Sequence, residues 1–286
     1  MNKKTSRIKF LQDKKKSFDK ITMLTAYDYP TAKIVDAAGI DMILVGDSLA
    51  NVVLGLDDVK EVSLSDMIHH AKAVRRGVEN AFMVVDIPFC ACQNIYRGKA
   101  IENIKTLIKE TNCDAIKLEW FEGVLELIES LVADNIAVVG HVGLTPQRAE
   151  ELGGYKVQGK ICQGAVEIYK QAKQMQGYGC FSIVIECVPT TVAEVITKNL
   201  RIPVIGIGAG KYCDGQILVY HDLLGFDFGR LPKFVKKYME SKPLAIKSIE
   251  NFCKDVKLQK FPTSDQSYSM DQKEDSYFRK SIEKIA

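Results

Sequence analysis

Short apolar segments alternate along the chain with longer segments in which apolar residues recur every three or four positions. The first kind is typical of strands covered on both faces, and the second is typical of helices with one buried side. In residues 99–110, for example, Ala100, Ile104 and Leu107 would share one helix face. We expect eight strands, at residues 21–26, 42–45, 82–85, 115–119, 137–141, 181–186, 204–207 and 216–220.

Eight strands that alternate with helices predict an α/β fold, the closed parallel (β/α)8 TIM barrel. An open doubly wound sheet is the alternative, but it would need a glycine-rich turn after its first strand, where residues 27–30 read Tyr-Asp-Tyr-Pro. We expect residues 1–258 to form a single barrel domain that includes an N-terminal extension and a helix at 232–257. Residues 259–286 turn polar and are expected to form a mobile tail.

Composition excludes some classes of function. The 286 residues are 47% hydrophobic and 26% charged with a net charge of +3, which is ordinary for a globular protein. Without a basic cluster that contains aromatic residues, nucleic acid is not an expected partner. Lys14, Lys15 and Lys16 are interpreted as a solvated surface. Since no apolar run approaches about 20 residues and the N-terminus lacks a hydrophobic signal segment, we expect no membrane contact.

The eight cysteines are scattered and form no Cys-x-x-Cys pair, which indicates a reducing compartment and predicts a cytoplasmic protein. Cys90 and Cys92 are the only close pair. Because no further metal ligands stand beside them, we interpret them as buried thiols.

Acidic residues end four of the predicted strands: Asp47, Asp86, Glu119 and Glu186. In a barrel the carboxyl ends of all strands open on one face, so these side chains would converge. Several unpaired carboxylates in one cup repel each other unless they are protonated or share a cation, and oxygen donors without His or Cys favour Mg²⁺. The alternative is that each acid caps the following helix or pairs with an arginine.

Lys117 stands two residues before Glu119, so both side chains point to the same side of their strand. Three carboxylates with one Mg²⁺ would leave a single excess negative charge, which Lys117 would balance. A 2-oxo acid could chelate such a metal, and Glu186 could then remove the adjacent proton.

Three further features leave alternatives open. His141, which ends the fifth predicted strand, is either a substrate-binding group or a hydrogen-bonded structural residue. Ser48 would either bind a substrate carboxylate or cap the next segment. The Gly-Ile-Gly-Ala-Gly turn at residues 206–210 would serve either tight packing or an anion cradle of backbone N–H groups.

From residue 21 to residue 238 the chain resembles one family, the ketopantoate (3-methyl-2-oxobutanoate) hydroxymethyltransferases. The motifs that carry the resemblance are Leu-Thr-Ala-Tyr-Asp at 24–28, Val-Gly-Asp-Ser at 45–48, Asp-Ile-Pro-Phe at 86–89, Lys-Leu-Glu at 117–119, Gly-His-Val-Gly-Leu-Thr-Pro-Gln at 140–147, Gly-Gly-Tyr-Lys-Val-Gln-Gly at 153–159, Glu-Cys-Val-Pro at 186–189, Ile-Gly-Ile-Gly-Ala-Gly at 205–210 and Asp-Gly-Gln at 214–216. Departures from the family pattern stand at Ala50, residues 56–59 and Trp120.

The resemblance implies transfer of a one-carbon unit from 5,10-methylenetetrahydrofolate to 3-methyl-2-oxobutanoate, a step of pantothenate biosynthesis that gives 2-dehydropantoate. It also implies a homodecamer built as a pentamer of dimers. The matching positions put Mg²⁺ on Asp47, Asp86 and Glu119, and they make Glu186 the proton acceptor. Substrate binding falls on Asp47, Ser48, Asp86 and Lys117.

Two rival functions remain. The first is a magnesium-dependent carbon–carbon lyase or mutase of related barrels, which often carry a reactive cysteine in a mobile loop; Cys90 and Cys92 are the nearest candidates. The second is a non-catalytic barrel that binds a metabolite, which the joint presence of four acids and Lys117 disfavours.

Overall fold

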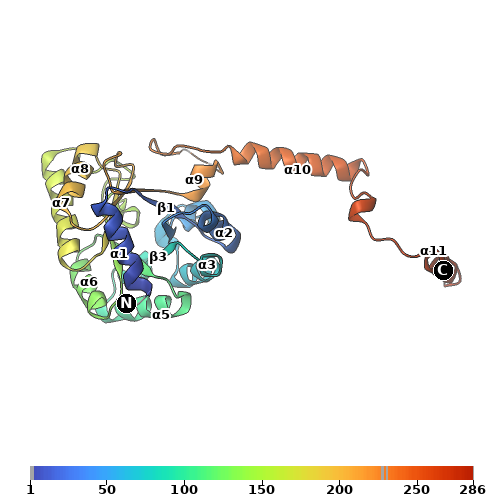
Figure 1. The fold of residues 1–286 in the computed structure, drawn as a ribbon, viewed down its shortest axis with the longest axis horizontal. Coiled ribbons are helices and arrows are strands. Elements are labelled where there is room, and N and C mark those ends of the chain that lie inside the picture. Colours follow the sequence, from blue (N-terminus) through green and yellow to red (C-terminus); the bar gives the residue numbers. More distant parts are fainter. Residues whose placement is uncertain (1–2, 227–228, 230, 286) are drawn as a thin grey trace. The chain divides into compact units, whose positions relative to one another are not determined.

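The computed structural model, which describes residues 3–226, 229 and 231–285, contains a closed barrel of eight parallel strands in chain order (Figure 1). The predicted TIM-barrel fold is therefore confirmed. The strands are β1 (Ile21–Thr25), β2 (Met42–Val45), β3 (Phe82–Asp86), β4 (Ala115–Glu119), β5 (Val138–Gly143), β6 (Ser182–Glu186), β7 (Val204–Ile207) and β8 (Gly215–Leu218).

Helices connect the strands. The α-helices are α1 (Lys3–Lys16), α2 (Tyr29–Ala37), α3 (Leu64–Gly77), α4 (Phe89–Cys92), α5 (Arg97–Thr111), α6 (Val124–Ala133), α7 (Cys162–Gly177), α8 (Thr190–Asn199), α9 (Tyr220–Leu224), α10 (Ser241–Lys257) and α11 (Gln272–Glu283). Single turns are the π-helix η1 (Ala50–Leu54) and the 3₁₀ turns η2 (Val59–Glu61), η3 (Pro146–Arg148) and η4 (Ser264–Gln266). No helix of the described residues has the length and apolar character needed to span a membrane.

Some boundaries differ from those expected. The last strand begins one residue earlier, at Gly215, and β5 continues past His141 to Gly143, so His141 lies within its strand. The helix expected at 232–257 begins only at Ser241. The N-terminal extension, for which no element was predicted, forms the helix α1.

Alternate residues of the strands belong to two separate hydrophobic clusters. Met83, Val85 and Ile116 pack outward with the helices, whereas Val84 and Ala115 belong to a cluster inside the barrel. Side chains of a strand point to opposite faces in turn, so the apolar runs supply both layers at once. On several strands the residue of the inner cluster is followed, on the same face and nearer the carboxyl end, by a polar residue, as Val84 is by Asp86.

One end of the barrel is closed by α1, which crosses it in Figure 1. Leu11 of α1 is 1% exposed and joins the inner cluster. Lys14 Nζ lies 2.8 Å from Asp41 Oδ1, and Lys15 Nζ lies 2.6 Å from Asp214 Oδ2. The interpretation of this lysine block as a solvated surface is wrong for Lys14 and Lys15, because both side chains are largely covered and pair with partly buried carboxylates.

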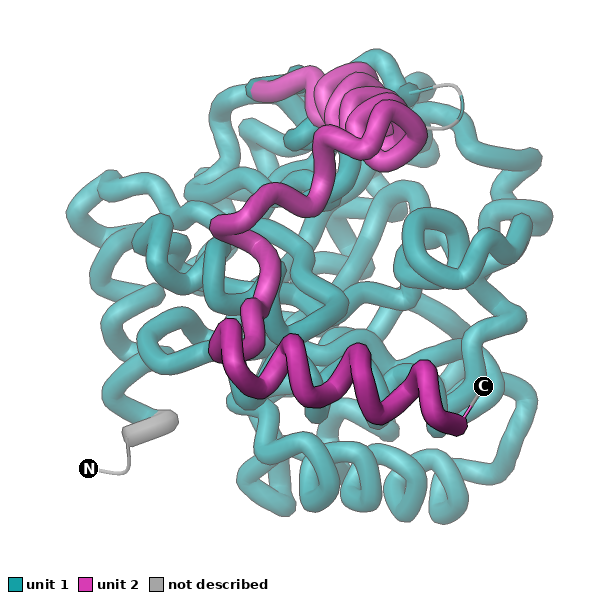
Figure 2. The backbone as a smooth tube through the Cα atoms, turned by 90° about the vertical axis from the view of Figure 1, so that its right-hand side faces the viewer, with its two compact units in different colours: residues 1–238 teal, residues 239–286 magenta. Residues whose placement is uncertain are grey.

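Contacts divide the chain into two compact units, residues 1–238 and 239–286 (Figure 2). The first unit contains the whole barrel. The expected domain limit after residue 258, and the mobility of residues 259–286, stay predictions.

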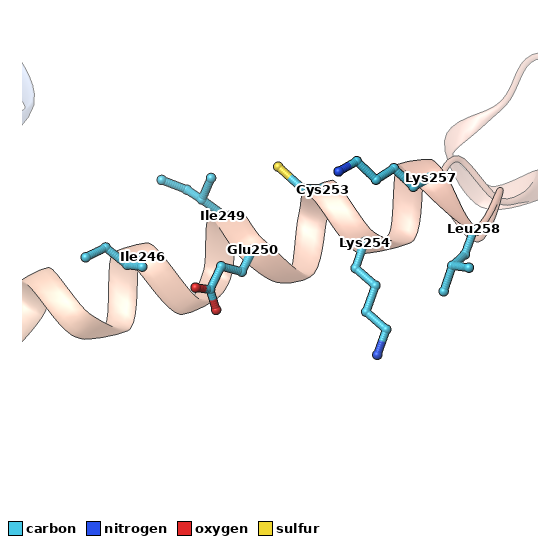
Figure 3. Close-up of a pocket in the computed structure, with 7 residues that line it drawn as sticks. All are labelled: Ile246, Ile249, Glu250, Cys253, Lys254, Lys257 and Leu258. Carbon is cyan, nitrogen blue, oxygen red and sulfur yellow. The ribbon is translucent and has the colours of Figure 1, made fainter.

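The second unit has a surface hollow of about 590 Å³ along α10. All its lining residues come from this helix and its end, and Figure 3 shows them on both sides of the one helix. Apolar and lysine side chains predominate, with a single carboxylate from Glu250. These side chains therefore do not converge on one point as those of a catalytic site do.

Candidate active site

A cavity of about 860 Å³ opens at the carboxyl ends of the strands, within the first unit. All the site residues predicted from the sequence line it: Asp47, Ser48, Asp86, Lys117, Glu119, His141 and Glu186. In the described structure none of the four acids pairs with an arginine or caps the helix that follows it. The capping alternative for the acids is therefore wrong, while the role of each residue stays a prediction.

An ion pair between Lys117 and Asp86 joins β4 to β3. The two residues are direct partners in the parallel register, and Lys117 Nζ lies 2.5 Å from Asp86 Oδ1. Burial opposes the ammonium charge, but the carboxylates of Asp86, Asp47 and Glu119 outweigh it and raise the pKa of Lys117. The site therefore keeps one permanent cation.

His141 lies between two of the acids. Its Nδ1 is 3.4 Å from Glu119 Oε1, and its Nε2 is 3.3 Å from Glu186 Oε2. Neither nitrogen forms an aligned hydrogen bond with a described residue. Burial and the charge of Lys117 lower the pKa of His141, but the close contacts with Glu119 and Glu186 outweigh them and raise it to about 9. An imidazolium therefore bridges these two carboxylates at neutral pH.

Asp47 has the least favourable surroundings of the four acids. It follows Gly46, where a Cβ would lie 2.8 Å from Ser48 Oγ, so a larger residue would displace the Ser48 hydroxyl. The Asp47 N–H donates to Asp86 Oδ2 at 3.2 Å. Burial, followed by the charge of Asp86, raises the pKa of Asp47 to about 8. The cluster therefore holds more negative charge than Lys117 and His141 neutralise.

Gln147 is the residue that the sequence reasoning missed. Its side-chain Nε2 donates to Asp47 Oδ2 at 2.7 Å, and its backbone N–H donates to Glu119 Oε2 at 3.1 Å. The other oxygen of Glu119, Oε1, is buried without a hydrogen-bond partner among the described residues. Gln147 ends the motif at residues 140–147, which was the one available signal, but the acids that it contacts, Asp47 and Glu119, are distant in the sequence.

Tyr27 was also missed, although it belongs to the motif at residues 24–28. Its hydroxyl lies 2.8 Å from Ser48 Oγ, and its side chain is almost fully buried. The next turn, η1, begins after Leu49 without any side-chain cap, so the alternative that Ser48 caps it is wrong. Ser48 instead lines the cavity with its hydroxyl held by Tyr27.

The glycine turn after β7 packs closely against side chains. A Cβ on Gly208 would lie 2.6 Å from the Phe234 ring, and one on Gly210 would lie 2.5 Å from Thr190 Oγ1. Both glycines have positive φ angles, of 61° and 82°. These contacts account for the glycines by tight packing, which was the first of the two interpretations, and they leave no need for an anion cradle.

The oxygen ligands present fit a hard cation only in part. In the described residues, no group of three or more His, Cys, Asp and Glu side chains is arranged so that it could hold a metal ion by itself. Lys117 and Gln147 already occupy one oxygen each of Asp86 and Asp47. Mg²⁺, however, usually binds one or two carboxylates and completes its shell with water and substrate. Glu119 Oε1 lies 3.4 Å from His141 Nδ1 without an aligned hydrogen bond in the described residues, and this oxygen and the excess negative charge suit such an ion.

Comparison of the sequence with protein families finds that residues 5–264 match the family described as ketopantoate hydroxymethyltransferase. A relative from Thermoanaerobacter sp. is 48% identical over 260 residues, which cover 91% of this chain and 94% of that protein. Another from Geobacillus thermodenitrificans is 45% identical over 91% of this chain and 93% of its own length. Both are named 3-methyl-2-oxobutanoate hydroxymethyltransferase.

Solved structures with the same fold are far more distant in sequence. A phosphonopyruvate hydrolase in complex with oxalate and Mg²⁺ has a TM-score of 0.58 and 13% identity, and the match covers 98% of this chain and 97% of that one. A 2,3-dimethylmalate lyase of the PEP mutase/isocitrate lyase superfamily has a TM-score of 0.57 and 13% identity, over 92% and 91% of the two chains. At this identity the likeness concerns the fold alone.

Proposed function

The chain belongs to the ketopantoate hydroxymethyltransferase family, and on that premise we propose that it transfers a hydroxymethyl group from 5,10-methylenetetrahydrofolate to 3-methyl-2-oxobutanoate, giving 2-dehydropantoate for pantothenate synthesis. The observation that carries the proposal is the side chain of Glu186, which lines the cavity 3.3 Å from His141 Nε2, together with the buried acids and Lys117 that line the same cavity.

Glu186 is the proposed base that removes the C3 proton of the substrate. Its side chain is 15% exposed, whereas those of Asp86 and Glu119 are 3% and 2% exposed, so it is the acid best able to meet a substrate. The His141 ring, 3.3 Å away, would orient the Glu186 side chain. A positive φ angle of 47° at Cys187 turns the chain directly after Glu186.

Lys117 is proposed to bind the anionic end of the substrate. It is held by Asp86, so it would present its charge in a defined place and compensate charge as the enolate forms. Ser48, with its hydroxyl oriented by Tyr27, would donate a hydrogen bond to the substrate carboxylate.

We propose that Mg²⁺ binds to Asp47, Asp86 and Glu119, with substrate or water completing its coordination. When bound, Mg²⁺ supplies a Lewis acid that stabilises negative charge on the ketone oxygen. The raised pKa of Asp47, which follows from burial and the charge of Asp86, supports this assignment. Among the described residues, Glu119 Oε1 has only an unaligned contact with His141 Nδ1, at 3.4 Å.

The outer part of the cavity is proposed to receive the folate. It is lined by Tyr155, Val157, Leu231 and Phe234, whose aromatic and apolar side chains suit a flat heterocycle. The cavity is also much larger than a five-carbon oxo acid requires. A homodecamer stays a prediction based on the family resemblance, and a cytoplasmic location stays one based on the scattered cysteines, none of which forms a disulfide in the described residues.

Two cysteines were named as candidates for the rival lyase or mutase function. Cys90 is exposed, so its interpretation as a buried thiol is wrong. Cys92 is buried, and burial raises the pKa of its thiol well above the ordinary value. Cys90 Sγ lies 3.5 Å from the Val62 carbonyl oxygen.

The test is proton NMR of 3-methyl-2-oxobutanoate in D₂O with the protein and Mg²⁺. We expect the C3 proton signal to disappear without folate, and Glu186→Gln to slow this exchange by at least about 100-fold. Glu126→Gln, a change on the exposed face of α6, is the matched control and should exchange normally. If the wild-type protein does not exchange the C3 proton of 3-methyl-2-oxobutanoate but turns over phosphonopyruvate or 2-methylisocitrate, the rival function is established instead.

A further inference from the structure

The buried side chain of Gln147 has partners for both N–H donors and for its carbonyl oxygen inside the protein. One Nε2 proton goes to Asp47 Oδ2 at 2.7 Å and the other to the Ile87 carbonyl oxygen at 3.0 Å. Its Oε1 accepts from Gln93 Nε2 at 2.7 Å. An amide has two donors and one acceptor oxygen, so these three contacts fix which way it points.

Gln93 is in turn held in place. It is 6% exposed, it directly follows α4, and its backbone N–H donates to the Phe89 carbonyl oxygen at 2.9 Å. The result is a buried chain of donors that runs from Gln93 through Gln147 to Asp47. Gln147 itself does not line the cavity, and neither does Gln93.

The same residue also reaches the second acid. Its backbone N–H donates to Glu119 Oε2, as η3 begins at Pro146 directly before it. Asp47 and Glu119 therefore each have one oxygen anchored by Gln147. For Glu119 the opposite oxygen, Oε1, is buried and lies 3.4 Å from His141 Nδ1 without an aligned hydrogen bond in the described residues.

We propose that Gln147 is a positioning residue, which fixes one oxygen of Asp47 and one of Glu119 and so sets how these two carboxylates meet a shared cation. This inference rests on the proposed function for the identity of the cation, but not for the geometry. Outer residues that orient metal-binding carboxylates commonly matter to affinity or activity by 10–100-fold. Gln93 acts one step further out by orienting the Gln147 amide.

The chemistry requires an amide at this place. Methionine has a similar length but cannot donate, so Asp47 Oδ2 would lose its hydrogen bond. Glutamate keeps the shape and can still accept from Gln93, but it turns an oxygen toward Asp47 and adds like charge. Neither change removes an atom that touches the substrate.

The experiment compares Gln147→Met, Gln147→Glu and Gln93→Met with Gln176→Met. Gln176 is the matched control, because its Oε1 accepts from the backbone N–H groups of Arg201 and Ile202, which precede β7 at the opposite end of the barrel. Each folded protein is titrated with Mn²⁺ alone by electron paramagnetic resonance, which reports Kd without turnover. Tm and C3 proton exchange are measured in parallel.

We expect both Gln147 variants to raise the Kd for Mn²⁺ by roughly 10–100-fold and to slow exchange, with partial recovery at high metal concentration. Gln93→Met should act in the same direction to a smaller extent, and Gln176→Met should change neither quantity. A merely structural role would lower Tm without moving the Kd of the folded protein. Wild-type Kd and exchange in folded Gln147→Met would overturn the inference.

Failure of the proposed function and failure of the positioning role of Gln147 give different results. If wild-type protein does not exchange the C3 proton, the substrate assignment fails, while weaker Mn²⁺ binding by the variants would still support the positioning role. If Gln147→Met does not fold, Gln93→Met decides, since it leaves the Gln147 side chain in place; a wild-type Kd in that variant overturns the inference.

Discussion

Acidic side chains lie at both ends of the barrel, but neighbouring cations neutralise them at one end and only in part at the other. At the end closed by α1, Asp114, Asp41 and Asp214 precede strands, and each is paired with at least one Lys or Arg from α1. At the open end, the four acids that end or follow strands share one lysine and one histidine. Near-neutral pairing serves stability, whereas the excess charge at the open end is available for a ligand.

The difference in surroundings also explains the pKa values. Burial and Asp86 raise the pKa of Asp47 to about 8, because no cation reaches it directly. Lys117 donates to Asp86 rather than to Asp47. The open end therefore stores unfavourable electrostatic energy that a bound cation would release.

The largest expected effect follows from removing the one permanent cation at the open end. Lys117→Met should reduce C3 proton exchange by about 100–1,000-fold, since a fixed charge that meets the developing negative charge is lost. It should also destabilise the protein by about 3–5 kcal/mol, because Asp86 is left as a buried, unpaired charge.

The double variant Lys117→Met/Asp86→Asn separates these two effects. It should regain much of the stability in urea unfolding but none of the exchange. Recovery of exchange in the double variant would contradict the assigned role of Lys117.

The closed end should respond in the opposite way. Asp114 accepts from Arg7 and from the Met83 N–H, so Asp114→Asn should lower the free energy of unfolding by about 1–3 kcal/mol. Exchange per folded molecule should stay within about twofold, as expected for a change at the stability face of a barrel. A selective loss of exchange without loss of stability would break the comparison.

Asp47→Asn should stabilise the metal-free protein while abolishing exchange. Removing one of several mutually repelling acids should raise Tm by about 2–4 °C, the shift that ~1 kcal/mol produces in a chain of this size. An unchanged or lower Tm would show that Asp47 is better compensated than its neighbours indicate.

Stability of the metal-free protein should fall as pH rises. The folded pKa of Asp47, about 8, lies above its ordinary value of 3.8. Between these two pH values the folded state keeps a proton that the unfolded state has lost, so the contribution of Asp47 to stability is largest below pH 3.8 and falls as pH rises. This contribution is lost progressively up to about pH 8. His141, raised from 6.5 to about 9, acts in the same direction over its own window. Tm measured from pH 5 to pH 9 should decline, and Asp47→Asn should flatten the lower part of that decline.

The smallest effect concerns the lysine block of α1. Lys16 has a side chain 72% exposed and pairs only with Asp13 in its own helix, so Lys16→Ala should change the free energy of unfolding by less than about 0.5 kcal/mol. Lys15→Ala should lower the free energy of unfolding by more, because the partner Asp214 also accepts from the Val204 N–H. Equal changes in the free energy of unfolding for Lys15→Ala and Lys16→Ala would contradict the distinction between a largely covered and a solvated lysine.

Much of the barrel was predictable because its signals are local. Each apolar run indicated one strand, and the alternation of side chains placed Lys117 and Glu119 on one face before any contact was known. The acids at strand ends were found for the same reason. The N-terminal helix was not, since its apolar positions are few and its role depends on the acids of distant strands.

The sequence by itself therefore determined the strands, the face of each side chain and the set of acids that meet at the open end. Only the tertiary structure decided which acid receives which partner. Gln147 and Asp47 are 100 residues apart, and their contact exists because the closed barrel brings the ends of distant strands together. The same closure pairs the lysines of α1 with acids at the other end, so burial and distance, rather than residue type, separate a structural carboxylate from one that can bind a ligand.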